Sequence, residues 1–91
     1  MNPNTAKLQL TIIHPDEESF TREVDVVSSS NLEGPFDVWP LHTNFISIIK
    51  DYLWVYQGKE KIMEIKVDTG ILRVTSNRVE VFLGIDTLNP K

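Results

Sequence analysis

The most informative segment of this chain is residues 33–49, which read EGPFDVWPLHTNFISII. Two short apolar runs flank a turn that contains Trp39, Pro40 and His42. Turns are normally built from small or polar residues such as glycine, asparagine and aspartate. An indole and an imidazole at this place indicate a turn that docks against another molecule. The alternative for His42 is structural, because an imidazole can bond a backbone group and fix its own turn.

The composition of the chain favours strands over helices. Valine and isoleucine together account for 18 of the 91 residues, and Ala6 is the only alanine. β-Branched residues fit a pleated sheet better than a helix. Turn signals recur about every 8–12 residues, a spacing typical of an antiparallel sandwich or barrel. We therefore predict an all-β fold, an antiparallel β-sandwich of roughly 8–10 short strands, as a single domain over residues 1–91.

Alternating apolar and polar residues predict a first strand that contains Leu8, Leu10 and Ile12. A second strand pair is expected over about residues 19–28, and residues 28–32 are expected to be a polar connection. The later strands are expected at residues 34–39, 45–49, 52–57, 61–68, 70–75 and 78–83. Turns are expected at Asp51, at Gly58 with Lys59, at Thr69 with Gly70, and at Ser76 with Asn77.

Two of these predicted strands, residues 45–49 and 52–56, are apolar on both faces. An antiparallel strand with one face in water should instead alternate. Either both faces are covered within the domain, or a partner covers the second face. We expect Trp54, in the middle of its strand, to lie in the core and Trp39 to lie at the surface.

Charge and cysteine content exclude several classes of function. The chain has 13 acidic and nine basic residues, a net charge of −4, which argues against a nucleic-acid partner. No cysteine is present, so disulfides and thiolate metal sites are excluded. His14 and His42 have no third ligand at chelating spacing, and no Gly-x-Ser-x-Gly elbow marks a nucleophile. We expect no catalytic residue, no metal site and no cofactor.

The sequence also predicts a soluble, intracellular chain. No apolar run approaches the roughly 20 residues that cross a bilayer, so we expect no direct membrane insertion. Residues 1–7 lack the features of a signal peptide. The acidic run at residues 16–18 follows Pro15 and is interpreted as solvated charge.

Residues 34–42 resemble the strand and turn of the epsilon subunit of F-type ATP synthases, where the family pattern is roughly Gly-Glu-Leu-Gly-Ile-Leu-Pro-Gly-His. The resemblance covers nearly the whole chain. The flanking positions that agree in order and spacing are residues 8–15, Phe20, and residues 23–27, 70–74 and 77–82. Asp37 and Leu41 stand where the family usually has glycine, and Pro35 stands where it often has an acidic residue. A left-handed backbone at Leu41 would cost about 1–2 kcal/mol.

The resemblance implies a non-catalytic rotor subunit in the central stalk of an F-type ATP synthase. Such a subunit links the gamma subunit to the c-ring and couples ATP synthesis or hydrolysis to ion transport. Its implied location is peripheral, on the cytoplasmic face of the bacterial plasma membrane. The implied c-ring interface is Pro35, Val38, Trp39 and His42. The implied gamma interface is His14, Phe45 and Ser47.

Two other classes of function remain open at this point. One is a free-standing β-sandwich binding module for a small ligand or sugar, which co-purification with gamma would distinguish from a rotor subunit. The weaker alternative is a small hydrolase, which a pocket holding paired acids would support.

The end of the chain carries one further expectation. Full-length epsilon subunits follow the sandwich with a pair of helices that can block the catalytic head. Residues 84–91 are too few for a stable helix, which needs about 12 residues, and they include Pro90. We expect the chain to restore coupling to an epsilon-depleted enzyme without lowering the hydrolysis rate of the detached head.

Overall fold

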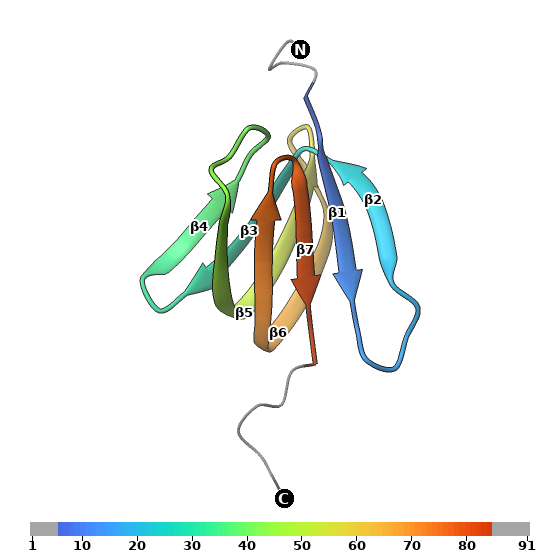
Figure 1. Ribbon diagram of the computed structural model, residues 1–91, viewed down its shortest axis with the longest axis vertical. Helices are drawn as coiled ribbons and strands as arrows, with labels where there is room; N and C mark the ends of the chain where they lie inside the picture. The colour runs from blue at the N-terminus through green and yellow to red at the C-terminus, as the bar shows by residue number, and fades with distance from the viewer. Residues whose placement is uncertain (1–5, 85–91) are drawn as a thin grey trace, which may run out of the picture.

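Seven strands form one continuous sheet that folds over on itself in the computed structural model, which describes residues 6–84 (Figure 1). The strands are β1 (Leu8–Ile13), β2 (Phe20–Val24), β3 (Val26–Asn31), β4 (Gly34–Val38), β5 (Phe45–Gln57), β6 (Glu60–Thr75) and β7 (Arg78–Phe82). Their order across the sheet is β2-β1-β7-β6-β5-β3-β4, and all neighbours are antiparallel except β1 and β7. The predicted all-β sandwich is confirmed, with fewer strands than expected and one parallel pair.

Strands β5 and β6 are long enough to belong to both layers of the sandwich, at 13 and 16 residues. The start of β5 pairs with the end of β6, the register shifts between Ile49 and Asp51, and the rest of β5 pairs with the start of β6. The turns predicted at Asp51 and at Thr69 with Gly70 are therefore wrong. At both places a continuous strand bends.

Asp51 and Gly70 permit this bend for different reasons. Asp51 has a left-handed backbone with a φ of 74°, which aspartate tolerates better than most residues do. Gly70 lies so close to the next strand that a Cβ atom would come within 3.0 Å of the Phe82 carbonyl oxygen. Residues that usually mark turns mark bends here, because the flanking segments continue to pair.

The core lies between two layers. The first layer contains β2, β1, β7 and the paired residues 45–49 and 70–74, and the second contains β4, β3 and the paired residues 51–57 and 60–67. Leu8, Leu10 and Ile12 are buried, as predicted. The other largest fully buried side chains are Ile49, Leu53, Leu72, Val24, Val27, Val38, Val55, Val74, Val79 and Val81.

Strand β3 places consecutive buried serines in the sheet, namely Ser28, Ser29 and Ser30. The predicted polar connection at residues 28–32 is wrong, because these serines continue the strand. Ser28 Oγ donates a hydrogen bond to Asp37 Oδ1, and Ser29 Oγ donates to the Tyr52 carbonyl oxygen, each at 2.6 Å. These hydrogen bonds offset the cost of burying the hydroxyl groups.

Asp25 joins three segments at the corner between β2 and β3. Its Oδ1 forms an ion pair with Lys7 Nζ, and its Oδ2 accepts a hydrogen bond from the Gly58 backbone N–H. The hydrogen bond from Lys7, followed by that from Gly58, lowers the pKa of Asp25. The ionised carboxylate therefore ties the beginning of β1 and the β5–β6 hairpin to this corner.

Replacing Asp25 with asparagine should lower the free energy of unfolding at neutral pH by about 0.5–1 kcal/mol, because the charge-assisted bonds are lost in a partly exposed site. The pKa of Asp25 is lower in the folded than in the unfolded state, so its contribution is present above the unfolded pKa and is lost as the pH falls through the folded pKa. Urea denaturation at neutral and acidic pH, with Asp68→Asn as the matched control, should show a difference that shrinks in acid. An equal difference at both pH values would contradict this role.

Candidate functional site

The turn at residues 39–42 is held in one shape by hydrogen bonds from two parts of the chain. The backbone N–H of His42 donates to the Trp39 carbonyl oxygen at 3.2 Å. Leu41 takes the left-handed conformation with a φ of 68°, which costs a non-glycine residue about 1–2 kcal/mol. Its N–H donates to Asn77 Oδ1 at 2.7 Å. Asn77, between β6 and β7, therefore stabilises the strained residue of a distant turn.

Aromatic side chains pack against the same turn. His42 Nδ1 lies 2.7 Å from the Thr43 carbonyl oxygen, and the His42 ring centroid lies 5.0 Å from that of Phe45. Phe45 in turn meets Phe36 edge-on, with centroids 5.7 Å apart. The His42 ring thus hydrogen-bonds a backbone carbonyl group, as expected if its role is to fix its own turn. Trp39 is 58% exposed and lies at the surface, also as predicted.

The residues implied for the c-ring interface do not all face outward. Pro35 and Trp39 are exposed and line the same groove, whereas His42 is half-buried in the turn. Val38 is fully buried in the core. Its side chain therefore supports the turn from inside the domain and does not reach a partner.

The residues implied for the gamma interface are separated by the fold. Phe45 and Ser47 alternate with the outward positions of β5 and share the inner side with the fully buried Ile49. Ser47 Oγ accepts a hydrogen bond from Asn31 Nδ2 at 3.1 Å. His14 follows β1, which β7 and β6 separate from β5 in the sheet.

A row of apolar side chains crosses the outer side of the first layer. We call it the apolar outer face and define it by Ile13, Ile46, Ile48, Ile71 and Phe82. Ile46 and Ile48 are 65% and 67% exposed, and the strand registers place Ile71, Phe82 and Ile13 in succession beside Ile48. Of the two alternatives for residues 45–49, coverage of both faces within the domain is excluded, because the second face is open. The sequence pattern did not predict that Ile71, Phe82 and Ile13 belong to the same apolar surface, because their alignment depends on which strands are neighbours in the sheet.

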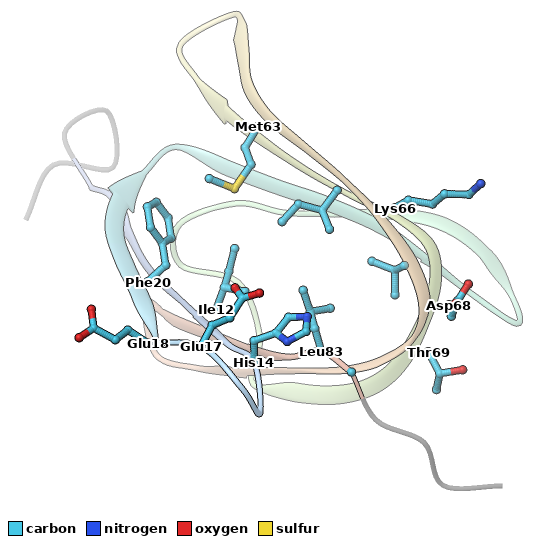
Figure 2. A pocket seen from close by; sticks show the side chains of 13 residues that line it. Ile12, His14, Glu17, Glu18, Phe20, Met63, Lys66, Asp68, Thr69 and Leu83 are labelled. Atoms are coloured by element: carbon cyan, nitrogen blue, oxygen red, sulfur yellow. The ribbon is translucent and has the colours of Figure 1, made fainter. Parts of the chain in front are cut away.

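One end of the sandwich opens into a cleft of about 810 Å³ beside β1, β2 and β6 (Figure 2). Ile12, Phe20 and Met63 give it apolar walls. The buried Nδ1 of His14 has no hydrogen-bond partner among the described residues. Charged side chains at the cleft are Glu17, Glu18, Lys66 and Asp68. Across residues 6–84, no group of three His, Asp or Glu side chains is arranged to hold a metal ion.

A shallower groove of about 550 Å³ lies on the outer side of the second layer, and we call it the aromatic groove. Six of the residues that line it are Pro35, Asp37, Trp39, Tyr52, Trp54 and Tyr56. The prediction that Trp54 lies in the core is wrong. Trp54 is half-buried on the outer side and stacks on Tyr52 with ring centroids 4.2 Å apart. Its neighbours Leu53 and Val55 take the inward positions because side chains alternate along a strand.

Comparison with known sequences gives a consistent result. Residues 7–84 match the family described as ATP synthase, Delta/Epsilon chain, beta-sandwich domain. The ATP synthase epsilon chain of Thermodesulfovibrio yellowstonii is 33% identical over 78 residues, which cover 86% of this chain and 56% of the relative. That of Nitratidesulfovibrio vulgaris (strain DP4) is 32% identical over 74 residues, which cover 81% of this chain and 55% of the relative. The chain thus spans about half the length of the curated relatives it matches.

Solved structures with the same fold come from two mitochondrial ATP synthases. A chain of the Euglena gracilis enzyme, determined with OSCP, F1 and c-ring, superposes with a TM-score of 0.76 at 22% identity, covering 89% of this chain and 57% of that chain. A chain of the Tetrahymena thermophila central stalk and c-ring gives a TM-score of 0.69 at 9% identity, covering 93% and 78%. At these identities the likeness establishes the fold alone. Residues 6–84 of the present chain contain no helix suited to crossing a membrane.

Replacing Asn77 with alanine should loosen the turn at residues 39–42, because the Leu41 N–H loses its acceptor. We expect the free energy of unfolding to fall by about 1 kcal/mol and the Leu41 amide to exchange with solvent much faster. Amide hydrogen exchange followed by NMR measures the second effect. The matched control is Asn77→Asp, which keeps an acceptor oxygen and should keep the protection of Leu41. Unchanged exchange at Leu41 in the alanine variant would contradict the assignment.

Proposed function

This chain belongs to the delta/epsilon family of ATP synthase subunits, and we propose that it is a non-catalytic central-stalk subunit of an F-type ATP synthase. In this role it links the gamma subunit to the c-ring and couples ATP synthesis or hydrolysis to ion transport. It works without a cofactor, as a peripheral part of the complex on the cytoplasmic face of the bacterial plasma membrane. The relatives named ATP synthase epsilon chain and the central-stalk and c-ring assemblies with the same fold support this role.

The observation that carries the proposal is the apolar outer face. Ile46 and Ile48 project from the first half of β5, where they are more than half exposed. Soluble domains place continuous apolar surface in water mainly where a partner covers it. We assign this face to gamma, since a stable contact needs roughly 800 Å² from each partner and the row extends over four adjacent strands. Phe45 and Ser47 lie behind the face and fix the course of β5, and His14 lies just beyond its Ile13 end.

The turn at residues 39–42 is assigned to the c-ring, with Pro35, Trp39 and His42 as contact residues and Val38 as their internal support. The turn leads directly into β5, so only a few residues separate Trp39 from Ile46 along the chain. Strand β5 is hydrogen-bonded to β6 along most of its length and to β3 over its second half. A force applied at the turn therefore passes into a strand that is paired on one or both sides, which suits a subunit that transmits torque.

Replacing Ile46 and Ile48 together with serine should weaken binding to the gamma subunit by more than about tenfold, because apolar anchors near the centre of an interface contribute most of its affinity. Stability should change little, since both side chains are already exposed. Binding is measured by isothermal titration with gamma from the same organism. Leu32→Ser is the matched control, because Leu32 is 94% exposed in the β3–β4 turn and lies outside the face. Unchanged gamma binding in the double variant would refute the assignment of this face.

Replacing Trp39 and His42 with alanine should weaken retention of the chain on the detergent-solubilised rotor while moving the melting temperature little. The reason is that Trp39 is mainly exposed and His42 makes local contacts within its turn. Retention is measured by co-purification with tagged c-ring, and stability by thermal denaturation. A loss of more than about 2–3 kcal/mol with normal retention would show that the two residues serve folding instead.

A further inference from the structure

The aromatic groove lies in the second layer, on the opposite side of the core from the apolar outer face. Tyr52, Trp54 and Tyr56 occupy every second position of β5, so their side chains share one side of the sheet. The strand register places Ser28 beside Trp54 and Val26 beside Tyr56. Trp39 adds an exposed indole at the β4 side. Four large rings therefore surround a shallow depression on a face that is open to solvent.

The rings are ordered by contacts within the domain. Tyr52 and Trp54 stack with an interplanar angle of 28°, and Lys61 Nζ lies 4.0 Å from the centroid of a Trp54 ring. Lys61 also pairs with Glu64 at 3.1 Å, which holds its ammonium group in place. Because these contacts order Tyr52 and Trp54 before any ligand arrives, binding to these two rings loses little side-chain freedom.

Charge is distributed unevenly along the groove. Asp37 lies on the β4 side, where the strand registers place Ser28 between it and Trp54, and Ser28 Oγ donates to its Oδ1 at 2.6 Å. Burial, followed by the negative charge of Asp37, raises the pKa of Tyr52. Lys59 lies beside Gly58 in the β5–β6 hairpin, beyond Tyr56. The groove therefore has a carboxylate on its β4 side and an ammonium group at its hairpin end, with aromatic side chains between them.

We propose that the aromatic groove binds an extended, proline-bearing peptide segment whose basic side chain pairs with Asp37. A polyproline II segment has no internal hydrogen bonds and is already extended, so it docks against ordered aromatic side chains at low entropic cost. An arginine opposite Asp37 would form charge-assisted bonds with a carboxylate that Ser28 already orients.

Other ligand classes fit the groove less well. A sugar needs several polar groups that converge on its hydroxyls, whereas Ser28 and Asp37 are already bonded to each other. A nucleic acid would stack on the rings, but its phosphates would meet Asp37 and a chain of net charge −4. The proposal goes beyond the central-stalk function and shares with it only Trp39 and Pro35, which line both the groove and the turn region.

The test is an NMR titration of the ¹⁵N-labelled chain with an oligoproline peptide that carries one central arginine. We expect saturable shifts at the indole N–H of Trp54 and the amide of Asp37, with a Kd below about 1 mM. The same peptide with glutamate in place of arginine should bind about tenfold more weakly. Maltohexaose, titrated in parallel, should cause no saturable shift in the groove.

Two variants locate the contacts, and a third serves as the control. Asp37→Asn should weaken the arginine peptide about tenfold and remove most of its advantage over the glutamate peptide. Trp54→Leu should weaken both peptides alike, and Ile48→Ser on the apolar outer face should weaken neither. Absence of saturation below about 10 mM peptide, tighter binding of maltohexaose, or an unchanged arginine preference in Asp37→Asn would each overturn the proposal. None of these results depends on gamma or the c-ring, so the central-stalk function stands or fails separately.

Discussion

The bend shared by β5 and β6 is the constraint on which the rest of the fold depends. A flat seven-stranded sheet of this size would leave one whole face of apolar side chains in water. Two long strands that bend at the same level bring the two halves of the sheet face to face, so Ile49 and Leu53, on either side of the bend, both enter one core. Gly70 makes the bend compact, since its missing side chain lets β7 approach closely. The domain reaches a closed core with short connections and no helix in the described residues.

The same bend explains why the two outer sides of the domain carry different chemistry. Before the bend, the outward positions of β5 are Ile46 and Ile48, whereas after it they are Tyr52, Trp54 and Tyr56. The register shift between Ile49 and Asp51 separates these two sets while both keep strict alternation within their own layer. One strand therefore supplies an aliphatic surface to the first layer and an aromatic surface to the second. The two surfaces can be occupied at the same time, because the core lies between them.

Much of this fold could be predicted from residues whose local pattern agrees with their final environment. Leu8, Leu10 and Ile12 alternate and are buried, and Trp39 next to a proline is exposed. The failures occur where local chemistry and tertiary context disagree. Asp51 and Gly70 have the residue types of turns, but strand pairing on both sides of them overrides that preference. The serines of β3 look like a loop, and only the acceptors Asp37 and Tyr52 make their burial tolerable.

The candidate surfaces were less predictable than the fold because they depend on neighbours in space. The apolar outer face exists only because β7 lies between β1 and β6, a parallel crossover that no local pattern indicates. Trp54 was wrongly predicted to lie in the core, because an aromatic residue in an apolar run fits either side of a strand. Its outward direction follows only from the burial of its neighbours Leu53 and Val55, which take the inward positions. The turn at residues 39–42 was recognisable from its composition. Its anchoring through Asn77 was not, because the two residues joined by that hydrogen bond lie 36 positions apart.

The placement of the exposed apolar side chains favours docking of a specific partner over aggregation through strand pairing. The two end strands of the sheet are β2 and β4. Pro35 in β4 discourages pairing of that strand with another chain, and the charged Arg22 and Glu23 do the same in β2. Ile46 and Ile48 lie in the part of β5 that pairs with β6 on one side only, because β3 pairs with β5 from Lys50 onward. A partner that covers these two side chains must still pack against the face of the sheet, because side chains project perpendicular to the plane in which the strands are hydrogen-bonded. Such a contact depends on side-chain complementarity and not on backbone hydrogen bonding, which makes the face selective for one partner in a way that an open edge is not.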